Sequence, residues 1–117
     1  MYFTKETIDY RDHLDGTYSL LEDLVLITSD WQRILVPKGY RCNGSSIPRF
    51  FWRVCGAPND PQNIRAGFVH DYCYGNKLYG RKECDKLFEK ILVKEGKPRL
   101  IAWGMYGAVR AFGGSHY

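Results

Sequence analysis

The sequence predicts an α+β fold, in which an N-terminal antiparallel β-meander is followed by a three-helix bundle that contains a His-Asp helix hairpin. Residues 17–41 are rich in β-branched and aromatic side chains, whereas three later stretches show helical spacing of apolar residues. Hydrophobic residues make up 44% of the chain and aromatic residues 15%, which supplies large rings for a core. A chain of 117 residues has the usual length of one domain, so we expect a single domain over residues 1–117.

The predicted meander covers about residues 17–41, "TYSLLEDLVLITSDWQRILVPKGYR". Short breaks at "ED" and "SD" separate its strands, and Pro37 and Gly39 end the last one. Residues 42–60 then form a loop dense in Gly, Pro, Asn and Ser, which encloses one short apolar helix or turn, "IPRFFWRVC". A loop of this composition often carries functional residues.

Three helices are predicted at about residues 61–79, 81–95 and 98–112. The first follows the cap and first-turn proline of "NDP" and has Ile64, Phe68 and Tyr72 at intervals of four. The second has an apolar stripe and ends at Gly96. The third begins at Pro98 and is apolar, with Gly104 and Gly107 on one face, where another element can approach closely.

The charge pattern indicates which partners to expect, and the N-terminus indicates where the protein is made. The net charge of +4 is scattered along the chain, and no nucleic-acid motif accompanies it, so we expect no nucleic-acid partner. The first residues lack the basic and apolar segments of a signal peptide, and no apolar run approaches the length of a membrane span. We therefore expect synthesis in the cytoplasm, without export by a signal peptide.

The four cysteines, Cys42, Cys55, Cys73 and Cys84, show neither C-x-x-C spacing nor the histidine arrangement of a zinc finger. A structural zinc site is therefore not expected. Reduced, buried thiols are the usual state of such cysteines in a cytosolic chain.

The candidate site lies in "FVHDYCYG", residues 68–75, and in "ECD", residues 83–85. Tyr74 follows His70 by four residues and so shares its side of a helix, whereas the adjacent Asp71 points about 100° away. If the two helices form an antiparallel hairpin over "GNKLYG", Asp85 comes within hydrogen-bond reach of the imidazole. The pattern thus predicts a histidine held by the carboxylate of Asp85. It leaves the second carboxylate, Asp71, as a candidate to bind a cation.

A histidine held in this way keeps one ring nitrogen protonated and leaves the other to accept a proton from water, as general-base catalysis near neutral pH requires. Asp71 is the candidate ligand for a hard cation, with Asn43 and the other oxygens of the "CNGSSIP" loop as further ligands. Calcium fits such an oxygen-rich site and polarises an ester or phosphoryl oxygen.

A purely structural interpretation competes with this one. A His-Asp pair on a helix is commonly a capped or salt-bridged surface pair, and Tyr74 is then a ring at the edge of the core. Asp85 in that case pairs with Arg81 one turn earlier, and the loop that begins at Asn43 is an ordinary turn.

Four segments, "ILVPKGYRCNGSSIPRFFW", "AGFVHDYCYG", "RKECDKLFEKIL" and "MYGAVRAFGG", resemble a family of small proteins encoded by tailed phages and prophages, a domain of unknown function. In that family a strand ending in V-P-K-G-F or Y leads into a Gly-Ala/Ser-Ser-Ile-Pro loop, and a helix with H-D-x-x-Y follows. The likeness covers nearly the whole chain. The family loop often has Asp where this chain has Asn43.

"FVHDYCYG" and "ECD" are also similar to the catalytic helices of secreted phospholipase A2. The resemblance implies that His70 is the general base, Tyr74 supports it and Asp85 orients it. It further implies that Asp71 binds calcium and that Cys73 is disulfide-bonded to Cys84. The Gly-rich calcium loop of those enzymes has no counterpart here, since "VCGAPNDPQN" occupies its place.

Two functions follow as expectations. The first is a phage-encoded, calcium-dependent, metal-assisted hydrolase that acts on a lipid or another ester at the cell envelope. The second is a non-enzymatic virion or tail-associated structural or assembly protein, whose partners are other virion or tail proteins. A protein with either role can be carried in the virion, and the first implies contact with a lipid or membrane surface.

Overall fold

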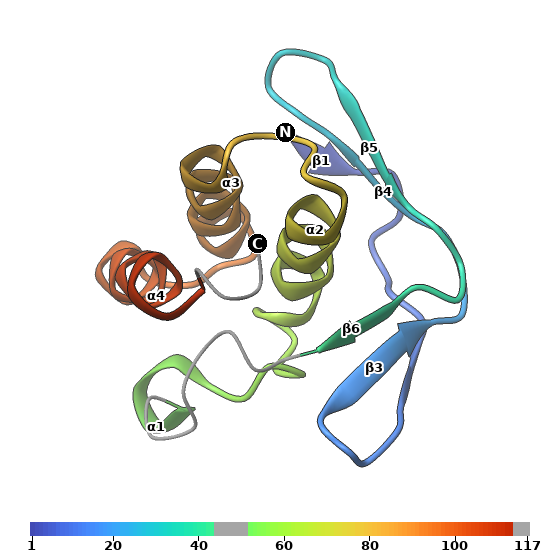
Figure 1. Ribbon diagram of the computed structural model, residues 1–117, viewed down its shortest axis with the longest axis horizontal. Helices are drawn as coiled ribbons and strands as arrows, with labels where there is room; N and C mark the ends of the chain where they lie inside the picture. The colour runs from blue at the N-terminus through green and yellow to red at the C-terminus, as the bar shows by residue number, and fades with distance from the viewer. Residues whose placement is uncertain (44–51, 114–117) are drawn as a thin grey trace. The chain divides into compact units, whose positions relative to one another are not determined.

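The protein was analysed as a computed structural model that describes residues 1–43 and 52–113. The chain divides into two compact units, Met1–Asn43 and Gly44–Tyr117. The first contains antiparallel strands and the second contains helices, as Figure 1 shows. The predicted α+β class, with strands before helices, is therefore confirmed, and the boundaries of a single domain stay a prediction.

Six short strands make up the first unit. They are β1 (Tyr2–Phe3), β2 (Tyr10–Asp12), β3 (Thr17–Leu20), β4 (Leu24–Ile27), β5 (Arg33–Val36) and β6 (Arg41–Asn43). They form two three-stranded antiparallel sheets, in the orders β1-β4-β5 and β2-β3-β6. The strand region thus begins earlier than residue 17, where the sequence placed it.

The hairpin β4-β5 shows why these residues form strands. Its register pairs Leu24 with Val36 and Leu26 with Ile34. These four side chains are buried, whereas the residues between them are only half-buried. The period of two expected for a strand with one covered face is therefore present. At the tip of the hairpin Trp31 is exposed and has a φ of 64°.

The strands do not form the single continuous meander that the sequence predicted. Strand β3 pairs with β6 rather than with its neighbour in sequence, β4. The chain leaves the second sheet after Leu20 and returns to it through the "PKGY" turn, where Gly39 has a φ of 85° and donates a backbone hydrogen bond to Leu20. One hairpin of the first sheet is thereby inserted between two strands of the second.

The second unit contains one short and three long helices, α1 (Trp52–Cys55), α2 (Ile64–Asn76), α3 (Arg81–Lys94) and α4 (Arg99–Phe112). The long helices start and end within three residues of the predicted bounds. Lys77, in the left-handed conformation, ends α2, and Gly96 with a φ of 99° follows α3. Pro98 directly precedes α4, where its missing N–H is not needed.

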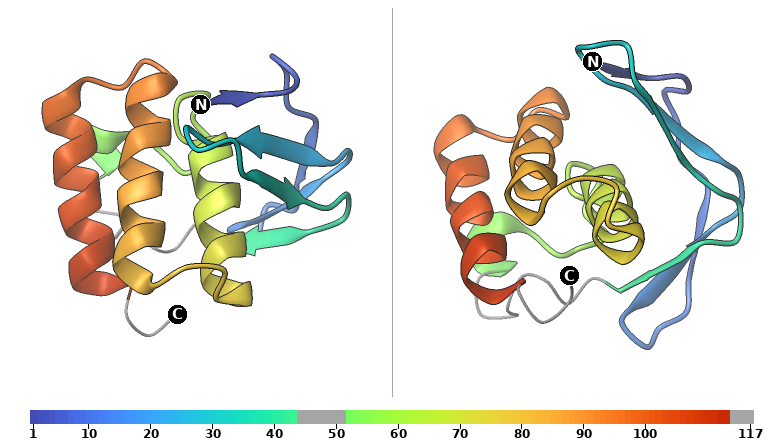
Figure 2. Two further views of the ribbon diagram at one scale, coloured as in Figure 1. Left: turned by 90° about the horizontal axis from the view of Figure 1, so that it is seen from above. Right: turned by 45° about the horizontal axis from the view of Figure 1, so that its top comes forward.

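Helix α3 lies between α2 and α4, and each helix runs antiparallel to the next (Figure 2). The core of this unit consists of fully buried apolar side chains on all three helices, namely Ala66, Phe68, Val69, Ile91, Leu92, Ala102, Met105 and Val109. None of the helices in the two described ranges is long and apolar enough to span a membrane.

Candidate functional site

The candidate site is built on the facing sides of α2 and α3. His70 and Tyr74 lie one helical turn apart on α2, and their ring centroids are 4.2 Å apart. Asp85 lies on the first half of α3, with its side chain fully buried. Because the short connection between the two helices makes them an antiparallel hairpin, these three side chains meet.

Asp85 is the centre of a hydrogen-bond network. Its Oδ1 lies 2.7 Å from Nε2 of His70 and accepts a second hydrogen bond from the Tyr74 hydroxyl. Its Oδ2 lies 3.1 Å from Nη1 of Arg110, near the end of α4. The carboxylate therefore ties all three long helices together. The predicted contacts of His70 and Tyr74 with Asp85 are present, and their catalytic roles stay predictions.

The network keeps Asp85 ionised. Burial alone would raise the pKa of Asp85, but the hydrogen bonds from His70, Tyr74 and Arg110 outweigh it, and the pKa lies below its ordinary value. Burial, together with the hydrogen bond to Asp85, raises the pKa of the Tyr74 hydroxyl, which therefore stays a donor. The hydrogen bond to Asp85 also raises the pKa of Arg110.

The geometry determines what His70 can do. With Asp85 ionised, Nε2 of His70 carries the proton that is donated to the carboxylate, so Nδ1 is the nitrogen that can accept a proton. The Phe88 ring lies 4.8 Å from the imidazole, centroid to centroid. Only 3% of the His70 surface is exposed, which restricts the access of water to the ring.

Arg110 is the residue that sequence reasoning missed. The structural interpretation assigned Asp85 to Arg81, one turn earlier on the same helix. In the structure Nη2 of Arg81 instead donates to the carbonyl oxygens of Val109 and Arg110 at the end of α4. The last carbonyls of a helix carry a partial negative charge and attract a cation, which explains why Arg81 binds the end of α4.

The two predicted metal ligands lie in different units. Asp71 is half-buried on α2 and has interaction partners. Asn43 ends β6, but its side chain and residues 44–48 lie outside the described part of the chain. Within the described ranges, His, Cys, Asp and Glu side chains form no group of three that could hold a metal ion. The calcium site stays a prediction.

Cys73 and Cys84 lie beside the network, on the same two helices. Both are buried free thiols, and the Cys84 thiol donates a hydrogen bond to the carbonyl oxygen of Tyr79, 3.7 Å away. The interaction between the two sulfurs raises the pKa of Cys73 and lowers that of Cys84. The structure thus brings the two predicted partners together, and the disulfide itself stays a prediction.

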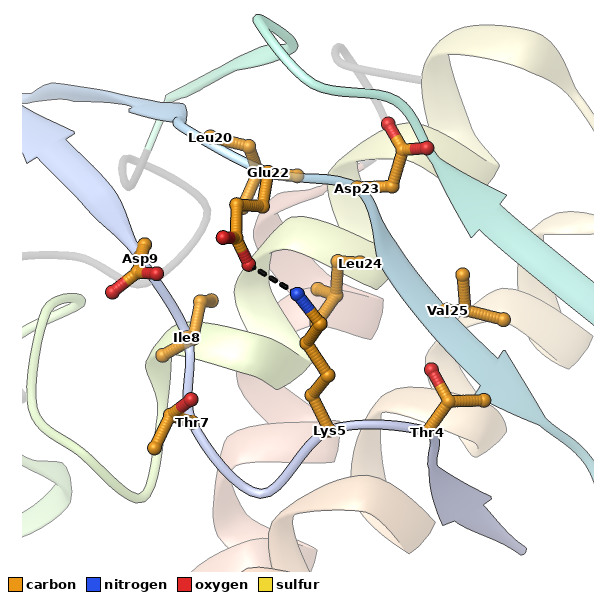
Figure 3. A pocket seen from close by; sticks show the side chains of 10 residues that line it. All are labelled: Thr4, Lys5, Thr7, Ile8, Asp9, Leu20, Glu22, Asp23, Leu24 and Val25. Carbon is orange, nitrogen blue, oxygen red and sulfur yellow. Dashed lines mark hydrogen bonds and ion pairs between the residues drawn. The ribbon is translucent and has the colours of Figure 1, made fainter.

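A separate pocket lies in the strand unit and is shown in Figure 3. Its polar feature is an ion pair with 2.5 Å between Lys5 Nζ and Glu22 Oε2, with Asp9 and Asp23 on either side. Both partners of the pair are about half exposed, and exposed ion pairs of this kind contribute little stability. The pocket shows no arrangement of groups suited to catalysis.

Comparison with known proteins places the site in a family. The family described as "Protein of unknown function (DUF1353)" matches residues 18–109. The chain belongs to the DUF1353 family. The matched range contains His70, Tyr74 and Asp85 and ends one residue before Arg110. The DUF1353 match therefore covers β3 to β6 and nearly the whole helical unit.

A relative in the bacterium Sinorhizobium fredii, "Uncharacterized protein y4jT", is 33% identical over 78 residues. The match covers 67% of this DUF1353 chain but only 23% of the relative, so the chain spans about a quarter of that protein's length. No solved structure matches the chain.

Proposed function

We propose that this DUF1353 protein is a hydrolase of lipid or other esters, with His70 as the general base. The observation that carries the proposal is the 2.7 Å contact between Nε2 of His70 and the buried Asp85 carboxylate. A carboxylate in this place fixes the tautomer and the orientation of the ring, and it stabilises the imidazolium that forms when water is deprotonated. The local resemblance to phospholipase A2 supports the same assignment.

In the proposed reaction Nδ1 of His70 takes a proton from water while the water oxygen attacks the carbonyl carbon of the ester. The proton then passes from the imidazolium to the leaving alkoxide, which departs as an alcohol. Tyr74 and Arg110 are positioning residues, because their polar groups bind the Asp85 carboxylate rather than a nitrogen of His70. Only 3% of His70 is exposed, so the proposed reaction requires a water molecule that reaches Nδ1.

In the proposal, calcium is a metal whose effect on hydrolysis the assay measures. A calcium ion takes six to eight oxygen ligands, and the described residues offer Asp71 as the single carboxylate at the predicted position. We therefore derive no step of the reaction through the metal. Asp71 is its proposed ligand in the helical unit.

The family likeness to tailed-phage proteins suggests where such an activity would be used. We propose that the protein is made in the bacterial host, is carried by the virion and acts on the lipid surface of the cell envelope during entry or lysis. Its partners would then be other virion or tail proteins.

The test measures fatty-acid release from phospholipid vesicles by mass spectrometry, in calcium and in a chelator. The wild-type protein is compared with His70→Gln and with Lys38→Gln, a control at an exposed residue of the strand unit. General-base catalysis is worth roughly 10² to 10⁴ in rate, so His70→Gln should lose at least about a hundredfold. Equal release by the wild-type protein and His70→Gln would rule out His70 as the base.

A second function is favoured by the full burial of Asp85 and by its three hydrogen-bond donors, two on α2 and one on α4. Satisfied buried networks of this kind fix one packing arrangement of a core. We propose as the alternative that the network is purely structural, in a non-enzymatic virion or tail-associated protein. Mass spectrometry of purified virions tests this alternative, because a structural component is present in a fixed number of copies.

A further inference from the structure

A row of lysines follows the outer side of α3. Lys82, Lys86, Lys90 and Lys94 are spaced four residues apart, and all four are exposed. Residues at this spacing lie next to one another along one side of a helix. Like charges four apart destabilise a helix, so the row has a structural cost that the packing of the bundle does not require.

Exposed apolar residues lie on the adjacent helix. Leu100 and Trp103 of α4 are 75% and 65% exposed, and Gly104 and Gly107 continue the exposed stripe. The spacing of three and four residues places these positions on one side of α4. An exposed tryptophan next to an exposed leucine is unusual for a surface that only meets water.

The two rows belong to one surface. Helices α3 and α4 lie side by side, and both views of Figure 2 show this. The Lys86 ammonium lies 4.8 Å from the centre of the Tyr106 ring of α4. One turn further along, Lys90 and Val93 of α3 line a shallow groove together with Arg99 of α4.

We call this surface the lysine face and define it by its cations, its apolar residues and its acids, namely Lys82, Lys86, Lys90, Lys94, Arg99, Leu100, Trp103, Glu83 and Glu89. Its five cations outnumber its two acids, which gives a net charge of +3. A partner that complements it must therefore be anionic and must also accept apolar side chains.

We propose that the lysine face binds the surface of an anionic phospholipid bilayer. The ammonium groups contact the lipid phosphates, while Trp103 and Leu100 enter the boundary between the headgroups and the acyl chains. Tryptophan is the residue that prefers this boundary, and lysine bears its charge on a flexible apolar stem that reaches the headgroups. A nucleic acid would match the charge but would leave Leu100 without an apolar environment.

This surface is distinct from the proposed site. The lysines lie on the exposed side of α3, whereas Asp85 lies on its buried side, toward His70 and Arg110. Binding to lipid therefore does not depend on hydrolysis. The two proposals can fail separately, because attachment can be measured in a variant without the proposed base.

The test is sedimentation of the full chain with phosphatidylglycerol vesicles or with phosphatidylcholine vesicles, using His70→Gln so that lipid is not consumed. Each lysine near an anionic surface contributes about fivefold in affinity. Lys86→Glu with Lys90→Glu should therefore weaken binding to phosphatidylglycerol by at least roughly twentyfold. Arg33→Glu with Lys38→Glu, two exposed cations of the strand unit, gives the matched control and should change the affinity far less.

A second measurement follows Trp103 by its fluorescence, as the difference between the protein and Trp103→Phe. Entry into the headgroup boundary should shift this emission to shorter wavelength with phosphatidylglycerol vesicles and leave it unchanged with phosphatidylcholine. The proposal is overturned if the protein does not sediment with phosphatidylglycerol, or if both double variants lose the same affinity. Binding to a DNA duplex that depends on Lys86 and Lys90, without binding to vesicles, would overturn it in favour of a nucleic-acid surface.

Discussion

Replacing Asp85 by asparagine tests the network most directly, because the shape of the side chain is kept and its charge is lost. Asparagine retains one acceptor oxygen but presents NH₂ donors where Asp85 has a second acceptor. His70 and Tyr74 then donate to a neutral oxygen, and Arg110 faces an amide that cannot accept its hydrogen bond. We expect the folded state to lose stability at neutral pH.

The size of the loss follows from the two fully buried hydrogen bonds. A hydrogen bond to a charged group contributes about 1.5 to 3 kcal/mol, and one between neutral groups about 0.5 to 1.5 kcal/mol. The loss of charge at Asp85 should therefore lower the free energy of unfolding by about 2 to 3 kcal/mol. Arg110 is about a third exposed and can turn toward water, so its bond is left out of this sum.

The loss should depend on pH. Because the pKa of Asp85 is lower in the folded protein than its ordinary value of 3.8, the charge stabilises the folded state fully above about pH 4. As the pH falls from there toward the folded pKa, the unfolded chain takes up a proton first, and the stabilisation is lost. The difference between wild type and Asp85→Asn should be largest at pH 7 and should shrink below about pH 4.

Urea unfolding at pH 7 and at pH 3 measures both effects, with Glu89→Gln on the same helix as the control. That control should stay within about 0.5 kcal/mol of the wild type, as is usual away from buried networks. If Asp85→Asn is as stable as Glu89→Gln at pH 7, the carboxylate does not stabilise this fold. If its effect is the same at both pH values, the stabilisation does not come from the charge.

Three further changes have expected outcomes. Tyr74→Phe removes one donor to the buried carboxylate and should lower the free energy of unfolding by about 1.5 to 3 kcal/mol in urea, whereas an effect below about 0.5 kcal/mol would place the hydroxyl outside the network. Leu26→Ala in β4 leaves a cavity at a fully buried site and should cost about 3 kcal/mol, and Leu14→Ala, at an exposed residue, should cost almost nothing; equal effects would contradict the described core. Under mild oxidation Cys73 and Cys84 should form a disulfide, visible by mass spectrometry as two thiols protected from alkylation after unfolding without reductant, and alkylation of both would refute the bridge.

The helices could be predicted from the sequence because their signals are local. Apolar spacing over more than ten residues, Gly96 after α3 and Pro98 before α4 place the helix bounds to within a few residues. Strand pairing is decided by contacts between distant residues. Strands β3 and β6 pair although a whole hairpin separates them, and β1 has only two residues, too few for a pattern.

The same distinction explains the candidate site. His70 and Tyr74 share one side of α2, and the short connection after α2 brings Asp85 to them, so the sequence predicts these contacts. Arg110 is 25 residues further along than Asp85, at the end of another helix, and no local pattern connects the two. Spacing favoured Arg81 as the partner of Asp85, but Arg81 binds the carbonyl end of α4, a contact that depends on the packing of the bundle.

The stability of Asp85 variants does not distinguish the two proposed functions, since a base needs the same carboxylate that a structural network needs. His70 does distinguish them. The amide of glutamine at position 70 can still donate a hydrogen bond to Asp85, but it has no nitrogen that accepts a proton in place of Nδ1. If the network is only structural, His70→Gln should cause a small loss of stability. If His70 is a general base, the variant should stay folded but lose ester hydrolysis. Ester hydrolysis that survives in a folded His70→Gln variant would exclude His70 as the base, whatever the origin of the activity.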